Sequence, residues 1–454
     1  VSLFGEAGPG HQVVAVVGQA EGCHETAFGL PINGRTYIQV WSMGKLAANG
    51  KAMSGSPSLL MLIGVDSGAV HDLAWCRWEG MACGSEGLGL LGVASGDGSL
   101  QILSVPQPER EWGAERRAVE LAPVVRLMVE DGARPFTGCG TSVRWGPDPG
   151  AEESGFAAFG CTTGEVFVVP VPGRWEEAEA VRRGAELGLV VLKSDEQVGV
   201  LCLDFAGDDS NTIVTGHTDG SLNFWDINKP LWPVFGFKSG KRCFITDVRW
   251  MSGNGGIVLY TMESGTVQLY VISTTTGRIL LERPFASWGC DVSAMQERVV
   301  IASSEGLVVQ TSPGDLEKLS TAAYKVKAKR HPAKVMFEVS QGQAQPNAEN
   351  HEAVHVVGMT WAGKGAMDLD VHRKRTNPRE SMEQVEVKKA KKDKKVVVEV
   401  EDEDQEQVLW DFPDLDVAVH RAKFHPGGEG LLLWAGKAGF MHCCVIPTDN
   451  LPDF

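Results

Sequence analysis

Short apolar runs separated by tight polar turns occupy residues 198–230. Two runs, 200–205 and 211–216, come first, and a third run, 221–227, alternates between two faces. Runs of this length with period-two alternation are typical of antiparallel strands and not of helices. The stretch therefore predicts most of one antiparallel sheet.

The turn before the third run contains Asp219 and Gly220, and the run itself ends in Trp225 and Asp226. Glycine can adopt the positive φ that a tight turn needs, and aspartate can accept a hydrogen bond from the turn backbone. A strand that ends in Trp-Asp after an Asp-Gly turn is typical of a blade of a WD-repeat β-propeller. Because a single copy is a weak signal, the hypothesis depends on recurrence.

The strand–turn–strand pattern does recur, each time with a glycine in the turn. The further copies occupy residues 93–105, 157–171, 258–272, 300–312 and 431–446. Their turn residues are Asp97 and Gly98, Gly164, Gly265, Gly306 and Gly439. A four-stranded blade needs about 40–45 residues, so the much wider spacing before Gly439 predicts a long insertion.

A second repeated segment precedes each copy of the first repeat along the chain. It is a short strand that ends in an aromatic residue, at 71–75, 141–145, 201–205, 245–250 and 420–424, with a weaker copy at 290–295. In a propeller these segments are the innermost strands, whose aromatic residues pack between blades. The two repeats together predict an all-β fold, a WD-repeat β-propeller with seven blades.

The domain organisation follows from these spacings. Residues 1–313 are predicted to contain blades one to six, with residues 36–42 in the first blade. Residues 416–454 are predicted to form the last blade, which closes the ring. An alternative is that the N-terminal strand completes the last blade. Residues 314–415 form the insertion, whose two possible strands would supply the outer strand of a blade or a small added sheet. Because residue 1 is Val1, we expect a fragment of a longer protein.

Composition and charge narrow the function classes. The net charge of −16 over 454 residues argues against a general polyanion binder. No apolar run reaches the ~20 residues that span a bilayer, so no membrane partner is expected. The ten cysteines include no CxxC pair, which favours reduced, core-filling thiols in the nucleus or cytosol.

The insertion contains a tract, residues 364–407, without apolar periodicity. Basic clusters at 372–379 and 388–395 precede an acidic run at 399–407, a composition that predicts disorder. The basic clusters resemble a bipartite nuclear-import signal; they could equally contact nucleic-acid phosphates or partners, or form a solvated loop. The candidate residues are Arg373, Lys374, Arg375, Lys388, Lys389, Lys391, Lys392, Lys394 and Lys395.

Motifs for catalysis are missing from the sequence. There is no P-loop, HExxH, nucleophile elbow or Cys/His zinc array, and the glycines of 87–92 lead into a strand instead of the helix that a dinucleotide site requires. We interpret His217 as a structural turn residue that bonds backbone or a neighbouring blade. His71 and His420 occupy matching places, which suggests a repeated hydrogen bond or a lining of the central channel. We therefore expect no enzyme, metal, cofactor or small-molecule substrate.

Four segments carry a family resemblance. Residues 69–78, 88–109, 223–234 and 287–309 resemble the WD-repeat propeller subunit of general transcription factor IIIC. The likeness covers about residues 59–309. Its most specific parts are the Leu-Leu-Gly-Val-Ala-Ser-Gly-Asp-Gly strand pair and Phe-Trp-Asp followed by Pro230 and Pro233.

The resemblance implies a non-catalytic subunit of the nuclear complex that recognises the internal B box promoter of transfer-RNA genes for RNA polymerase III. Its partners would be the other subunits, namely a second propeller subunit and the large winged-helix DNA-binding subunit, with DNA reached only through the complex. The alternative is a generic nuclear WD-repeat adaptor of a chromatin or ubiquitin-ligase complex, which holds a partner peptide in its central channel.

Overall fold

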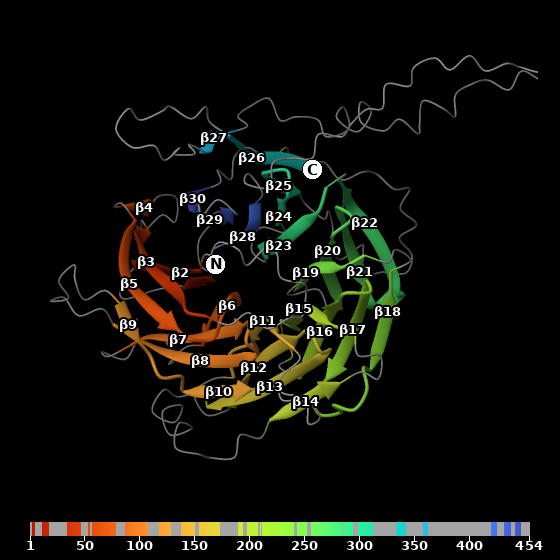
Figure 1. The fold of residues 1–454 in the computed structure, drawn as a ribbon. Coiled ribbons are helices and arrows are strands. Elements are labelled where there is room, and N and C mark those ends of the chain that lie inside the picture. Colours follow the sequence, from red (N-terminus) through yellow and green to blue (C-terminus); the bar gives the residue numbers. More distant parts are fainter. Residues whose placement is uncertain are drawn as a thin grey trace, which may run out of the picture.

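The strands of the computed structural model form seven sheets arranged around a ring (Figure 1). The structure describes residues 2–4, 11–17, 34–46, 53–54, 57–78, 87–107, 118–128, 138–149, 154–172, 189–193, 198–207, 209, 211–239, 243–251, 256–283, 285–293, 298–311, 333–341, 357–361, 419–424, 431–436 and 441–445. In these residues the elements are strands and one 3-10 turn, Ile272–Thr274. No helix in this part of the chain has the length and hydropathy to cross a bilayer.

The first three sheets come from the N-terminal part of the chain. The first contains β1 (Ser2–Phe4), β2 (His11–Val17), β3 (Thr36–Leu46), β4 (Met53–Ser54), β5 (Ser58–Val65) and β9 (Ala118–Glu120). The second contains β6 (Val70–Trp75), β7 (Gly87–Ser95), β8 (Ser99–Pro106) and β10 (Val125–Met128). The third contains β11 (Gly140–Trp145), β12 (Ser154–Cys161), β13 (Glu165–Pro172) and β14 (Val190–Lys193).

Four sheets complete the ring. The fourth contains β15 (Val200–Phe205), β16 (Thr212–His217), β17 (Ser221–Asp226) and β18 (Phe235–Lys238). The fifth contains β19 (Ile245–Trp250), β20 (Ile257–Met262), β21 (Thr266–Val271) and β22 (Thr276–Glu282). The sixth contains β23 (Ser287–Ser293), β24 (Arg298–Ser303), β25 (Leu307–Thr311), β26 (Ala333–Gln341) and β27 (Val357–Trp361). The last contains β28 (Val419–Phe424), β29 (Leu431–Gly436) and β30 (Met441–Val445).

This arrangement confirms the all-β propeller fold. The number of complete blades stays a prediction, because the seven sheets contain between three and six described strands. Strands β26 and β27 extend the sixth sheet outward, which is one of the two places expected for strands of the insertion. The boundaries 1–313, 314–415 and 416–454 also stay predictions, since much of the insertion lies outside the described residues.

The second sequence repeat forms the inner edges of six sheets. Strands β6, β11, β15, β19, β23 and β28 each lie at one end of their sheet and pack against the next in this order. Trp225 is 1% exposed and lies in a cluster with Val168 of the third sheet and Leu203 of its own. Burial of such a side chain contributes about 1.5–3 kcal/mol, and here it joins two sheets.

Glycines on second strands allow the next sheet to approach closely. A Cβ on Gly160 would lie 2.7 Å from Cγ1 of Val200, and one on Gly216 would lie 2.6 Å from Cγ2 of Ile245. Gly92, the last glycine of the supposed dinucleotide motif, has the same role, because a Cβ there would lie 2.7 Å from Cγ2 of Val143. These residues are needed for packing between sheets.

The ring closes by side-chain packing among the described residues. Val14 of β2 and Met43 of β3 form a small buried cluster with Leu433 of β29. β1 pairs with β2 inside the first sheet, so the alternative in which the N-terminal strand completes the last sheet is wrong for the described strands. The short connection between β1 and β2 favours this, because strands adjacent in sequence usually pair as a hairpin.

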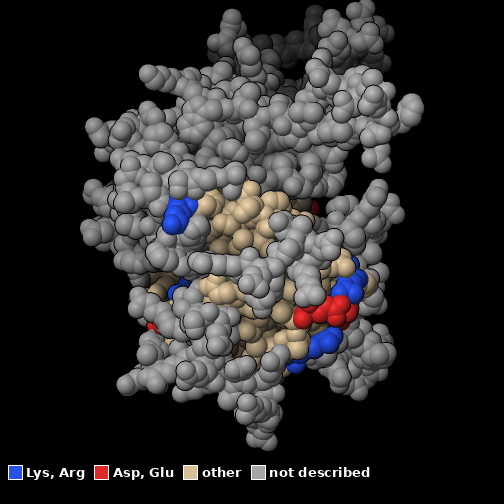
Figure 2. Space-filling view, turned by 90° about the vertical axis from the view of Figure 1, so that its left-hand side faces the viewer, with Lys and Arg blue, Asp and Glu red and all other residues tan. Residues whose placement is uncertain are grey.

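On the outer side of the first sheet, side chains of opposite charge lie close together. Arg35 forms ion pairs with Glu120 of β9 and with Asp66, and all three side chains are well exposed. On this side of the molecule acidic and basic side chains lie next to each other, and most of the described surface is uncharged (Figure 2).

We predict that Gly265→Ala strongly destabilises the fold. Gly265 has φ +77°, and a Cβ there would lie 2.3 Å from both the Arg283 and the Phe285 carbonyl oxygens. Backbone strain and steric overlap together should lower the free energy of unfolding by about 2–5 kcal/mol in thermal or urea unfolding. Gly34→Ala is the control: φ is +140° there, but nothing lies within 4 Å of the added Cβ, so strain alone should cost about 1–2 kcal/mol. Equal losses would contradict the steric account.

Candidate functional site: the charged centre of the ring

The six innermost strands share one register. Each has a register shift near its start, where one residue forms a β-bulge against the second strand. These bulge residues are His71, Thr141, Leu201, Thr246, Trp288 and His420. The four residues after the shift define positions one to four: 72–75, 142–145, 202–205, 247–250, 289–292 and 421–424. Position two is always apolar and buried, and position four is aromatic in five of the six strands.

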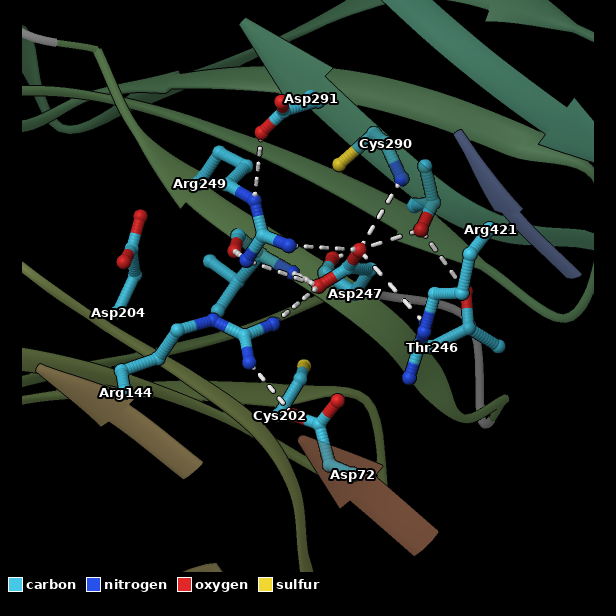
Figure 3. A network of polar contacts seen from close by, with 12 residues as sticks. Asp72, Arg144, Cys202, Asp204, Thr246, Asp247, Arg249, Cys290, Asp291 and Arg421 are labelled. Atoms are coloured by element: carbon cyan, nitrogen blue, oxygen red, sulfur yellow. Dashed lines mark hydrogen bonds and ion pairs between the residues drawn. The ribbon is translucent and has the colours of Figure 1, made fainter. Parts of the chain in front are cut away.

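Charged residues occupy positions one and three of these otherwise apolar strands. They are Asp72, Arg144, Asp204, Asp247, Arg249, Asp291, Arg421 and Lys423, four carboxylates and four cations. Six of these residues, from β6, β11, β19, β23 and β28, join one network of polar contacts at the centre of the ring, with Asp204 of β15 beside it (Figure 3). We call the eight charged residues together the central charge network.

The carboxylates bind the backbone of the next innermost strand. Each of the four accepts a hydrogen bond from one N–H: Asp72 from Val143 (3.2 Å), Asp204 from Trp250 (2.8 Å), Asp247 from Cys290 (3.1 Å) and Asp291 from Phe424 (2.9 Å). In every case the donor lies one position further along its strand than the acceptor. Since the inner edge of a sheet has no neighbouring strand in its own ladder, its N–H groups need such acceptors.

Asp247 connects sheets that are not neighbours. Its side chain is 1% exposed and lies 3.2 Å from Arg249 Nη1, 3.6 Å from Arg144 Nη2 and 3.8 Å from Arg421 Nη1. Arg144 belongs to the third sheet, Asp247 to the fifth and Arg421 to the last. The contacts therefore cross the centre of the ring, which the side chains occupy at this level (Figure 3).

Asp72 and Asp291 are paired with cations as well. Asp72 Oδ2 lies 2.5 Å from Arg144 Nη1, and Asp291 Oδ1 lies 3.1 Å from Arg249 Nε and 3.7 Å from Lys423 Nζ. The charges of the network compensate one another, which is the condition for burying them. Within the described residues no group of His, Cys, Asp and Glu is arranged to hold a metal ion.

The pKa values of the four carboxyl groups divide into two pairs. Burial raises the pKa of Asp72 and Asp247, but nearby guanidinium groups outweigh it, and both pKa values lie below their ordinary value. For Asp204 and Asp291 burial dominates, and their pKa values are raised. Burial lowers the pKa of Arg249, yet Asp247 and the other carboxylates outweigh it and raise that pKa well above its usual value.

Three of the bulge residues contact a neighbouring innermost strand. Trp288 and His420 stack with ring centroids 5.9 Å apart, and Thr141 Oγ1 donates a hydrogen bond to the Val200 carbonyl at 2.8 Å. His71 is equivalent to His420, as the matching sequence positions indicated. Burial lowers the pKa of His71, although Asp72 opposes this. These residues make structural contacts between strands.

The residues of the predicted WD blade form a buried chain of hydrogen bonds. Trp225 Nε1 donates to Thr215 Oγ1 at 3.0 Å, and His217 Nε2 lies 2.8 Å from the same hydroxyl. His217 Nδ1 lies 3.1 Å from the Val198 carbonyl oxygen, so it carries the proton. His217 is 1% exposed and therefore has the structural role expected for it.

The other blade residues are turn residues. Asp97 accepts from Ser99 N at 2.8 Å and Asp219 from Ser221 N at 3.0 Å. The turn glycines Gly98, Gly164, Gly220, Gly265 and Gly306 have φ between +77° and +91°, and each donates its N–H to the carbonyl three residues earlier. Gly439 and the basic residues Arg373, Lys374, Arg375, Lys388, Lys389, Lys391, Lys392, Lys394 and Lys395 lie outside the described residues.

Sequence reasoning missed the central charge network, although a signal exists. In the segments 247–250 and 421–424, charges alternate with apolar residues, and a charge within a buried strand usually has a partner. Five cysteines, Cys76, Cys139, Cys161, Cys202 and Cys290, are buried without disulfides. Burial raises the pKa of Cys76 to about 12, so this thiol is a packing residue.

Comparisons with known proteins support the fold. No protein-family model matches the chain. Protein transport protein SEC31 of Mycosarcoma maydis is 29% identical over 129 residues, which are 27% of this chain and only 9% of that protein. The crystal structure of Chaetomium thermophilum Raptor has a TM-score of 0.50 and 11% identity, covering 100% of this chain and 28% of that one. A structure of COPII on membranes, outer coat vertex, has a TM-score of 0.52 and 12% identity, covering 98% and 83%.

At these identities the structural likeness shows the fold alone, a β-propeller of the WD type. Such a fold is consistent with a scaffold that binds other proteins. None of the three proteins named here is a transcription factor IIIC subunit, so that resemblance stays a hypothesis.

We predict that Asp247→Asn severely destabilises the ring. The amide keeps the shape of the carboxylate but removes the negative charge that Arg144, Arg249 and Arg421 share. Among the described residues, Arg249 then has only Asp291 as a counter-charge and Arg144 only Asp72. Removing one partner of a buried ion pair costs about 3–5 kcal/mol, measurable by thermal or urea unfolding. The control is Lys193→Gln, since Lys193 is 54% exposed and pairs with Glu165 on the surface; it should cost at most about 1 kcal/mol. Similar losses for the two variants would refute a central role of Asp247.

The pKa shifts predict that the stability of two variants, relative to wild type, depends on pH in opposite directions. The pKa of Asp72 is lowered from 3.8 in the folded chain, so its carboxylate stabilises the fold above that pH and loses its effect as pH falls through the folded pKa. The pKa of Asp204 is raised, so the folded state gains stability when this group takes up a proton.

Unfolding free energies of wild type, Asp72→Asn and Asp204→Asn between pH 7 and pH 3 test this. The advantage of wild type over Asp72→Asn should be constant near neutral pH and shrink below about pH 4. Relative to Asp204→Asn, wild type should gain stability as pH falls. Parallel curves for all three proteins would show that neither shift exists.

Proposed function

We propose that this chain is a non-catalytic WD-type propeller scaffold that holds partner proteins on the outside of its ring. The observation that carries the proposal is the central charge network. Its carboxylates and cations compensate one another across the ring, and among the described residues no group of His, Cys, Asp and Glu is arranged to hold a metal ion. A centre built in this way supports a rigid ring whose rim and loops are available for binding.

The finer assignment is to the propeller subunit of transcription factor IIIC. Its support is the resemblance of the segments 69–78, 88–109, 223–234 and 287–309. The partners would be the second propeller subunit and the large winged-helix subunit, and DNA would be reached only through the assembled complex. The chain would act in the nucleus, with the basic clusters at 372–379 and 388–395 as the import signal or as phosphate contacts.

Two other scaffold roles compete with this assignment. The 129-residue match to the protein transport protein SEC31 favours a role in protein transport. A nuclear adaptor that holds a peptide in its central channel is less favoured, because Asp247, Arg144 and Arg421 meet across the centre. All three are binding functions and differ in their partners.

Affinity purification of the tagged full chain from its own cells distinguishes these roles. The proposal predicts stoichiometric recovery of the other transcription factor IIIC subunits, cross-linking of the tagged chain at transfer-RNA genes and nuclear fluorescence. Recovery of coat proteins with cytoplasmic fluorescence would replace the finer assignment with a transport role. A purified chain that turns over a substrate would overturn the scaffold proposal itself, and Asp247→Asn should reduce recovery of every partner only through loss of folded protein.

A further inference from the structure

The sixth sheet contains two buried polar side chains that are not paired. Arg298 of β24 is 7% exposed and Gln310 of β25 is 3% exposed. Within the described part of the chain, neither Nη1 of Arg298 nor Nε2 of Gln310 has a hydrogen-bond acceptor, and Arg298 forms no ion pair. Burial lowers the pKa of Arg298. Because buried charged groups normally have a partner, this pair of donors is an exception.

Both residues lie on the face of the sixth sheet that meets the last sheet. Val300 pairs with Gln310 on one side and with Asp291 on the other, so these three residues share a face. Arg298 lies two residues before Val300 and therefore has the same orientation. Asp291 accepts a hydrogen bond from Phe424 N of the last sheet, and β24 contacts β28. The opposite face packs against the fifth sheet.

The second to fifth sheets have mostly apolar residues at these two positions. In their strand registers the equivalents of Gln310 are Ile102, Val168, Phe224 and Leu269. Each of the four belongs to a hydrophobic cluster shared with the next sheet. The equivalents of Arg298 are Leu90, Phe156, Thr212 and Ile257. The sixth sheet thus places two hydrogen-bond donors where the other sheets pack mostly apolar side chains against the next sheet.

The carboxylate on this face is already in use. Asp291 lies 3.1 Å from Arg249 Nε and 3.7 Å from Lys423 Nζ. An ordered water can accept a hydrogen bond from the amide of Gln310, but it cannot neutralise the guanidinium of Arg298. The acceptor that fits both donors is therefore an anion.

We propose that Arg298 and Gln310 bind a small oxyanion, of the phosphate or carboxylate type, between the sixth and last sheets. The guanidinium would supply the counter-charge and a fork of N–H donors, and the amide would supply a further donor. The two donor atoms are covered by protein, which favours a small ion over a peptide. The bound anion would join the two sheets and stabilise the folded ring. This site is separate from the scaffold function and does not depend on it.

Equilibrium dialysis of the purified full chain with radiolabelled inorganic phosphate, and separately with acetate, tests the proposal. Chloride keeps the ionic strength constant. We expect saturable binding of one anion per chain and a melting temperature that rises with anion concentration until the site is full. Tighter binding of phosphate indicates a phosphate-type ligand, and tighter binding of acetate indicates a carboxylate. Absence of saturable binding for both anions would overturn the proposal.

Variants locate the site. Arg298→Met should weaken anion binding by roughly tenfold or more, and Gln310→Leu should weaken it several-fold. The matched controls are Arg126→Met, since Arg126 is 49% exposed, and Gln101→Leu, since Gln101 is 6% exposed but donates from Nε2 to Ser99 Oγ at 2.9 Å. Both controls should bind the anion as wild type does. Unchanged binding by Arg298→Met would place the anion elsewhere and refute the assignment.

Melting temperatures in chloride alone give an independent test. Arg298→Met should melt at or above the wild-type temperature, because an unpaired buried charge is replaced by an apolar side chain. Gln101→Leu should melt at a lower temperature, because it loses a hydrogen bond that is formed. Phosphate also stabilises proteins in general, so it should raise the melting temperature of wild type more than that of Arg298→Met. A large loss of stability of Arg298→Met in chloride would mean that Arg298 has a partner within the chain, and the proposal would be wrong.

Discussion

Hydrogen bonding at the inner edges of the sheets is the constraint on which this ring depends. Each innermost strand uses one edge for its own sheet and turns the other toward the centre, where no ladder partner exists. The carboxylates of Asp72, Asp204, Asp247 and Asp291 satisfy N–H groups on the following strand and so join consecutive sheets. After the shared register shift, Asp72 and Asp247 occupy position one and Asp204 and Asp291 position three of their strands. Each accepts from the residue one position further along the next strand, so the same local contact recurs at two levels of the ring.

These aspartates bring negative charge into a buried centre, and the cations neutralise it. A carboxylate buried without a partner is strongly destabilising, and a matched pair is tolerated. Arg249 binds Asp247 of its own strand and Asp291 of the next sheet, while Arg144 and Arg421 reach Asp247 from distant sheets. The network favours one arrangement of the sheets, because any other arrangement would separate these charges.

The compensated charges at the centre also bear on function. Where the centre is filled by compensated charges, a binding role is best served by the outside of the ring. The proposed scaffold role requires a rigid ring whose outer surface can meet partners.

Local patterns in the sequence were sufficient for the strands, the turn glycines and the innermost segments, because each depends on residues close to one another in the chain. Gly98 and Gly220 need positive φ, and period-two alternation needs only a strand.

Only the tertiary structure decided which residues meet across the ring. The sequence shows charges in apolar strands but does not pair Asp247 with Arg144 and Arg421, because that contact requires the ring to close. It placed the N-terminal strand in either the first or the last sheet, and the pairing of β1 with β2 settled this for the described strands. Trp225 and Trp232 are seven residues apart, yet one is buried and the other exposed, since burial is set by neighbouring sheets that local sequence does not specify.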